Sequence, residues 1–172
     1  MLGTPGIDFP LDLERPLPLP DRAFDAVYSS EVIEHIRREK VPALLLELRR
    51  ILKPGGVMRL TTPDMEACCQ LYLGTHKYPI NAIRDTWREG QFSNLIWMNT
   101  YMRDWGHQWV WDFPALSEAI ERAGFVNVNR CEPQITKSRL MELSALETRY
   151  GAHNSAERWA PTMIVEATGP PS

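Results

Sequence analysis

The sequence predicts an α/β fold whose central strands are parallel. Two short apolar stretches, at 24–29 and 57–61, have the length and composition of buried strands. Between them, residues 41–53 carry apolar side chains at helical spacing, and the turn residues Pro54-Gly55-Gly56 follow directly. Strands that alternate with helices in this way are typical of crossover units, in which the two strands pair in parallel.

Three helices are predicted in the first half of the chain from their capping residues and apolar spacing. Ser30 suits the N-cap of a helix that begins at Glu31, directly after the first strand. Thr62 suits the cap of a further helix, with Pro63 at its first position. The apolar face of the helix at 41–53 consists of Val41, Leu44, Leu45, Leu48, Ile51 and Leu52.

The second half of the chain continues the alternation. Asp112 and Gly124 are start and stop signals for one helix, and leucines at helical spacing predict another at 138–150. Strands are expected at 125–131 and 162–167. These last strands can pair antiparallel, because their connection need not be a standard crossover. The length of 172 residues predicts one domain over 1–172, with a core at 7–73 and 112–169 and an insertion or lid at 74–111.

Composition argues against several classes of function. The net charge is -3 and the basic residues are scattered, so we expect no nucleic-acid partner. No apolar run is long enough to cross a membrane and no signal-peptide pattern opens the chain, so we expect neither a membrane partner nor export. Three cysteines, an odd number, fit a reducing, cytoplasmic setting. Cys68, Cys69 and Cys131 lack zinc spacing, and we therefore expect no metal site.

Polar side chains gather where the first strand ends. Tyr28, Ser29 and Ser30 stand at its carboxyl end, which is the edge where open α/β sheets bind ligands. Alternatively the serines only cap the following helix, and both roles can hold at once. Glu31 and His35 lie four residues apart, so a helix would place them on one face. His35 would then orient the site or act as a base, or it is a hydrogen-bonded structural histidine.

A second concentration of reactive and aromatic side chains lies at 105–112. It contains three tryptophans and His107. The rings could form the wall of an acceptor pocket with His107 as its base. The alternative is a hydrophobic plug that packs the insertion onto the sheet.

Several segments, in this order and spacing, carry a resemblance. They are Asp12-Leu13, PLPLPD at 16–21, FDAVYSSEVIEHI at 24–36, LRRILKPGGVMRLTTPD at 48–64, WDFPALSEAIERAGF at 111–125 and MIVEATG at 163–169. Together they resemble the class I S-adenosylmethionine-dependent methyltransferases of the type 11 group, and within it a small bacterial subgroup. The resemblance implies a Rossmann-like, mostly parallel sheet of seven strands whose last two strands form an antiparallel pair.

The resemblance also implies a cofactor and the residues that bind it. Asp12 and Leu13 would contact the adenine of S-adenosylmethionine, and Tyr28, Ser29 and Ser30 would line its site. For Asp12 the alternative is a loop residue that forms a turn or a cap. Methyl transfer to a small molecule or a glycan-type acceptor would follow, with His35 or His107 as candidate catalytic residues.

The resemblance predicts a strand and a glycine-rich loop at the start of the domain. Residues 1–6 hold two glycines, but no apolar strand precedes them. Five prolines within 1–23 leave room for one short edge strand at 7–13. We therefore expect an incomplete, truncated sheet that begins near the third strand of the family.

An incomplete sheet suggests a second class of function. Without its usual neighbour, the strand at 24–29 would present an open edge that can pair with another chain. The alternative to an enzyme is therefore a catalytically inactive, methyltransferase-like module that binds a partner or forms a homodimer through this edge.

Overall fold

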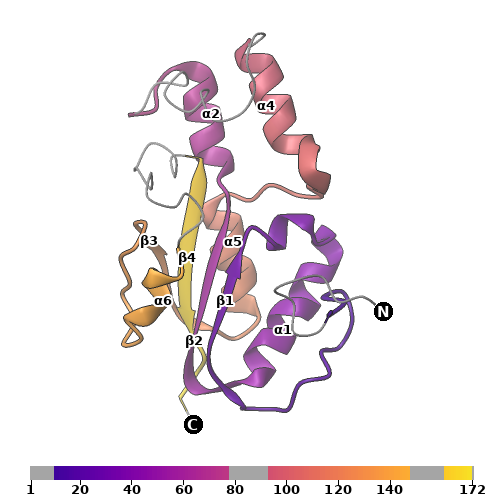
Figure 1. The fold of residues 1–172 in the computed structure, drawn as a ribbon, viewed down its shortest axis with the longest axis vertical. Coiled ribbons are helices and arrows are strands. Elements are labelled where there is room, and N and C mark those ends of the chain that lie inside the picture. The colour runs from indigo at the N-terminus through magenta and orange to yellow at the C-terminus, as the bar shows by residue number, and fades with distance from the viewer. Residues whose placement is uncertain (1–9, 78–92, 148–160, 172) are drawn as a thin grey trace.

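The computed structural model describes residues 10–77, 93–147 and 161–171 (Figure 1). Four strands form one sheet in the order β1-β2-β4-β3. The strands are β1 (Phe24–Ser30), β2 (Leu52–Pro63), β3 (Val126–Cys131) and β4 (Thr162–Thr168). The predicted α/β class is confirmed.

The direction of β4 makes the sheet mixed, with both parallel and antiparallel strand pairs. β1 and β2 are parallel, with Ser29 beside Leu60 and Ser30 beside Thr61. β4 lies between β2 and β3 and is antiparallel to both. β1, β2 and β3 therefore run the same way, yet one pair of neighbours in the described sheet is parallel. The antiparallel pairing of the last two strands is confirmed, whereas a mostly parallel sheet was wrong, because β4 inserts between two strands that run against it.

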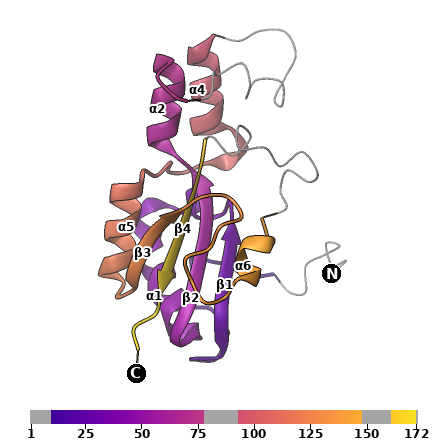
Figure 2. The same cartoon turned by 90° about the vertical axis from the view of Figure 1, so that its left-hand side faces the viewer.

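The helices divide between the two faces and one end of the sheet. α1 (Val41–Ile51) and α5 (Phe113–Arg122) pack against the face that carries Met58 and Leu60. The short helix α6 (Glu142–Ala145) lies on the opposite side of the sheet from α5 (Figure 2). α2 (Met65–Leu73) and α4 (Asn94–Arg103) extend beyond the carboxyl end of β2 (Figure 1).

The two helices that form the core follow their sequence signals. α1 buries the predicted apolar face, and Leu52 then turns into an extended conformation that begins β2 directly. The predicted helix was therefore two residues too long. In α5 the side chain of Asp112 accepts a hydrogen bond from the backbone N–H of Ala115, as an N-cap does. Gly124 follows with a φ of 87°, so the predicted start and stop are both confirmed.

Two predicted helix starts were wrong. Ser30 is the last residue of β1, and Glu31 has a φ of 53°, a left-handed conformation that cannot open an α-helix. Two 3-10 turns follow, η1 (Ile33–His35) and η2 (Arg38–Lys40). β2 continues past Thr62, and the cap of α2 is Asp64, whose side chain accepts from the N–H of Glu66.

The remaining predictions fall partly outside the described residues. Residues 10–13 form no strand, and 7–9 lie outside, as do the glycines expected at 1–6. Of the helix predicted at 138–150, the structure describes 138–147, where the helix α6 is shorter than predicted and covers only Glu142–Ala145; residues 148–150 lie outside. Of the segment 74–111, the structure describes 74–77 and 93–111, and its role as an insertion or lid stays a prediction. Across the described ranges, no helix is long and apolar enough to cross a membrane.

Candidate functional site

The carboxyl ends of β1 and β2 are joined by a group of polar side chains. The hydroxyl of Thr61 lies 3.0 Å from the Ser30 hydroxyl and 3.1 Å from Oε1 of Glu31, and can donate to either. The backbone N–H of Glu31 donates to the Thr61 carbonyl at 2.9 Å. These bonds hold Glu31 in its left-handed conformation and turn the chain out of the sheet at the edge where parallel strands present their ligand-binding ends.

An apolar groove of about 430 Å³ runs beside β1. Its lining includes Leu13, Tyr28, Ser29 and Ser30, so the structure brings together four of the five residues predicted to bind a cofactor. Much of the remaining wall is aliphatic and comes from the N-terminal segment, α1 and the sheet, with Leu11, Leu17, Leu19, Leu44, Leu48 and Leu60.

Asp12 does not line this groove. Its Oδ1 accepts a hydrogen bond from the N–H of Glu14 at 3.1 Å, and its Oδ2 pairs with Arg15 at 3.0 Å. This is the turn-forming arrangement that the sequence offered as the alternative to adenine contact.

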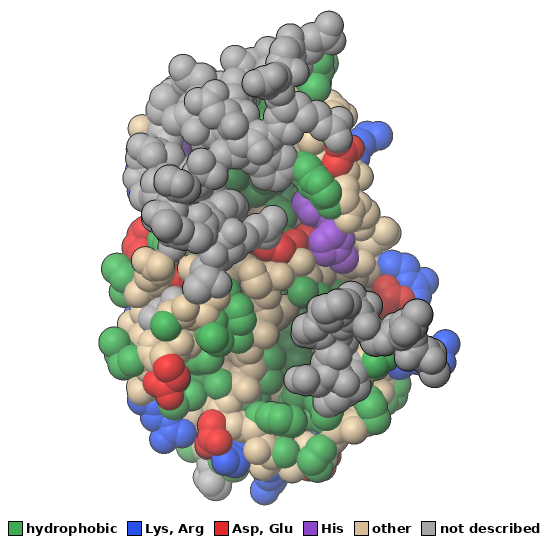
Figure 3. Space-filling model, viewed as in Figure 1, with side chains coloured by type: hydrophobic (Ala, Val, Ile, Leu, Met, Phe, Trp, Pro, Cys, Tyr) green, Lys and Arg blue, Asp and Glu red, His purple; other side chains and the backbone are tan. Residues whose placement is uncertain are grey.

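His35 and His107 meet at the same end of the sheet. Their ring centroids are 4.9 Å apart with the planes at 70°, and histidine side chains gather at one place on the face in Figure 3. The carbonyl of Glu34 accepts hydrogen bonds from the N–H groups of Gln108 and Trp109, at 2.7 and 3.1 Å. Backbone bonds therefore fasten η1 to the segment that carries His107.

Glu34 lies fully buried between this pair and the sheet. Its Oε2 accepts a hydrogen bond from the hydroxyl of Thr62 at 3.0 Å. Its Oε1 has no hydrogen-bond partner among the described residues and lies 3.8 Å from Nε2 of His35. Burial raises the pKa of Glu34 because the charged carboxylate loses its water.

His107 has a fixed tautomer. Its Nδ1 lies 2.8 Å from the carbonyl oxygen of Tyr101, which can only accept, so Nδ1 carries a proton and donates. Loss of hydration lowers the pKa of His107 and favours the neutral ring. A neutral ring protonated at Nδ1 has a free lone pair on Nε2, which suits a proton acceptor or a metal ligand.

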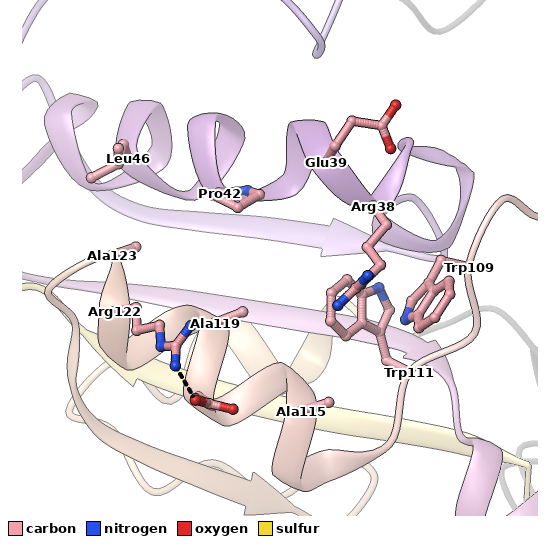
Figure 4. Close-up of a pocket in the computed structure, with 11 residues that line it drawn as sticks. Arg38, Glu39, Pro42, Leu46, Trp109, Trp111, Ala115, Ala119, Arg122 and Ala123 are labelled. Carbon is pink, nitrogen blue, oxygen red and sulfur yellow. Dashed lines mark ion pairs between the residues drawn. The ribbon is translucent and has the colours of Figure 1, made fainter.

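The tryptophans of 105–112 do not form one wall. Trp105 is half exposed, with its ring 5.7 Å from that of His107. Trp109 and the buried Trp111 line a separate cavity of about 560 Å³ between α1 and α5 (Figure 4). There the guanidinium of Arg38 stacks 4.8 Å above Trp109.

Two contributors to the site were missed at the sequence level. Spacing the residues after Ser30 as an α-helix pairs Glu31 with His35 and turns Glu34 about 100° away from His35. The 3-10 turn instead places Glu34 beside both histidines, while Glu31 lies outside the turn and bonds Thr61. Thr62 was expected to cap a helix, but it extends β2 and supports Glu34.

A comparison with known families bears on this arrangement. The model of the methyltransferase domain family matches residues 7–60, which contain the groove residues Leu13, Tyr28, Ser29 and Ser30 as well as Glu34 and His35. Over residues 7–60 the chain is similar to the methyltransferase domain family. The stretch ends within β2, so the match covers the parallel strand pair and the helix between its strands.

Solved structures resemble the chain over most of its length. A possible exported protein from Bordetella parapertussis has a TM-score of 0.50 and 13% identity, over 93% of this chain and 43% of that one. The CurJ carbon methyltransferase also has a TM-score of 0.50, with 12% identity, over 93% of this chain and 34% of its own. These two proteins share the fold of this chain.

A third structure, a SAM-dependent methyltransferase from Archaeoglobus fulgidus, has a TM-score of 0.46 and 15% identity over 87% of this chain and 61% of that one. The chain thus spans less than two thirds of the length of each of these three proteins. No curated protein matches its sequence significantly.

Proposed function

We propose that this chain takes part in methyl transfer from S-adenosylmethionine to a small-molecule or glycan-type acceptor. The observation that carries the proposal is that the segment matching the methyltransferase family holds both the groove beside β1 and the turn with Glu34 and His35. The turn lies at the carboxyl end of the parallel strand pair, and the groove runs along β1 to that same end, where α/β folds place their ligands.

The size and the lining of the groove support the binding of the cofactor there. Its volume of about 430 Å³ falls within the range of small-molecule sites. Aliphatic walls suit the adenine ring, and the hydroxyls of Tyr28, Ser29 and Ser30 offer donors and acceptors to its polar groups. When bound there, S-adenosylmethionine supplies an electrophilic methyl group. The protein then holds donor and acceptor in line, which lowers the barrier by about 7–11 kcal/mol in well-oriented reactions.

His35 and His107 form the acceptor side of the proposed site. Either imidazole is chemically able to take a proton from a hydroxyl or amine acceptor. His107 is the better prepared of the two, because the Tyr101 carbonyl fixes its tautomer and leaves Nε2 unprotonated.

Ser29→Trp is expected to weaken S-adenosylmethionine binding by about tenfold or more, because the indole would occupy the groove. Isothermal titration calorimetry of the whole chain measures this change. Ser117→Trp, on α5 and outside the lining of the groove, is the matched control and should bind as the parent protein does. Equal affinities in the two variants would place the cofactor elsewhere.

The alternative function, an inactive binding module, has one observation in its favour. β1 is an edge strand of the described sheet, and Phe24 at its start is exposed. Such an edge can pair with the edge of a second copy. Light scattering that finds a dimer, together with no heat of S-adenosylmethionine binding at millimolar ligand, would favour the module over the enzyme.

A further inference from the structure

We propose that Glu34, His35 and His107 bind one divalent transition-metal cation. Each residue offers one ligand atom, and the three atoms lie within 4.8 Å of one another. They come from two segments far apart in sequence, η1 and the stretch after η3 (Asp104–Gly106), which the backbone bonds of Glu34 hold together. The cluster is therefore built by the fold.

The buried carboxylate points most directly to a cation. Glu34 is fully buried, and its Oε1 is left without a hydrogen bond among the described residues. A buried, unsatisfied carboxylate oxygen is costly, and proteins normally pair such a group or use it to coordinate a metal. A cation between Glu34 and the two imidazoles would satisfy this oxygen.

The groups around the cluster resemble the supporting shell of a metal centre. Metal-binding histidines usually donate their second ring N–H to a carbonyl or carboxylate, and binding carboxylates are hydrogen-bonded in turn. The Nδ1–H of His107 donates to the Tyr101 carbonyl, and the Thr62 hydroxyl donates to Oε2 of Glu34. Both interactions leave a second atom, Nε2 of His107 and Oε1 of Glu34, available to a cation.

To bind a cation, the three ligand atoms must move slightly closer to one another. A tetrahedral cation with bonds of about 2.0–2.1 Å holds its ligand atoms about 3.4 Å apart. Oε1 of Glu34 and Nε2 of His35 are already 3.8 Å apart. The side chain of His35 is one-third exposed and beside Gly106, which has no side chain to obstruct a rotation of the ring.

The ligand set indicates the class of cation. Two imidazoles and one carboxylate suit zinc, cobalt, nickel or ferrous iron better than magnesium or calcium, which prefer oxygen ligands. Three protein ligands also leave a coordination position open. Binding of the cation does not depend on the proposed methyl transfer. Its role does rest on that function: the open position would take an oxygen of the acceptor, and the histidines would then act through the metal and not as bases.

Titration of the metal-free whole chain with zinc chloride, followed by calorimetry and without S-adenosylmethionine, tests the proposal. We expect one zinc per chain, and affinity about 100-fold weaker in His107→Ala and His35→Ala. His76→Ala is the matched control, since His76 lies outside the cluster, and should bind as the parent does. Glu34→Gln keeps the shape of the buried side chain and should also lose affinity while remaining folded by circular dichroism.

Cobalt provides an independent readout, since visible absorption bands on titration report a site with nitrogen and oxygen ligands. No zinc binding by the parent at millimolar concentration would overturn the proposal, as would equal loss in His76→Ala and His107→Ala. The Ser29→Trp variant separates the two proposals. It should bind zinc normally whether or not the chain binds S-adenosylmethionine.

Discussion

Replacing Arg59 by methionine is expected to lower the free energy of unfolding by about 3–5 kcal/mol. Arg59 lies on β2 and is fully buried. Its guanidinium donates to Glu147 at 2.6 Å and to Glu166 at 2.7 Å. Burial alone raises the pKa of Glu166, but hydrogen bonds from Thr136, the Lys137 backbone and Arg59 lower it overall, so this carboxylate is charged at neutral pH. Methionine would leave it buried without its cation.

Urea denaturation followed by tryptophan fluorescence measures this loss. Arg122→Met is the matched control, because Arg122 forms an exposed pair with Glu118 one helical turn away. Exposed pairs of this kind contribute about 0–1 kcal/mol. If Arg59→Met and Arg122→Met reduce the free energy of unfolding equally, the buried ion pairs of Arg59 with Glu147 and Glu166 do not stabilise the fold as proposed.

Leu45→Ala is expected to destabilise the fold by about 2–5 kcal/mol, because it leaves a cavity between α1 and the sheet. Leu45 is fully buried in the main core with Met58 and Leu60. Leu46 follows it on the same helix and is 48% exposed, so Leu46→Ala should change stability by less than about 0.5 kcal/mol. The same denaturation experiment compares the two. Similar losses would mean that α1 does not pack as described.

The elements that sequence predicts well are those with local signals. α1 follows from the spacing of its apolar residues, and α5 from Asp112 at its start and Gly124 at its end. The order of the strands has no local signal, because it depends on where β4 pairs, far along the chain from β2. Glu31 shows the same limit on a smaller scale, since hydrogen bonds from the neighbouring strand hold its left-handed conformation.

The candidate site divides along the same line. Tyr28, Ser29 and Ser30 line the groove, and their place could be predicted because open α/β sheets bind ligands at the carboxyl ends of their parallel strands. The meeting of His35 with His107 depends on long-range backbone bonds between η1 and the stretch after η3, which no spacing rule reveals. For this reason the sequence suggested two separate candidate bases and no metal site.

Titration of the isotope-labelled whole chain with S-adenosylmethionine, followed by backbone amide NMR signals, tests whether the groove beside β1 binds the cofactor. If the groove binds the cofactor, we expect the signals of Leu13, Ser29 and Ser30, which line it, to shift, and those of Asn127 and Asn129 on β3, at the far edge of the described sheet, to stay unchanged. Unchanged spectra at millimolar ligand, or shifts confined to β3, would contradict this binding.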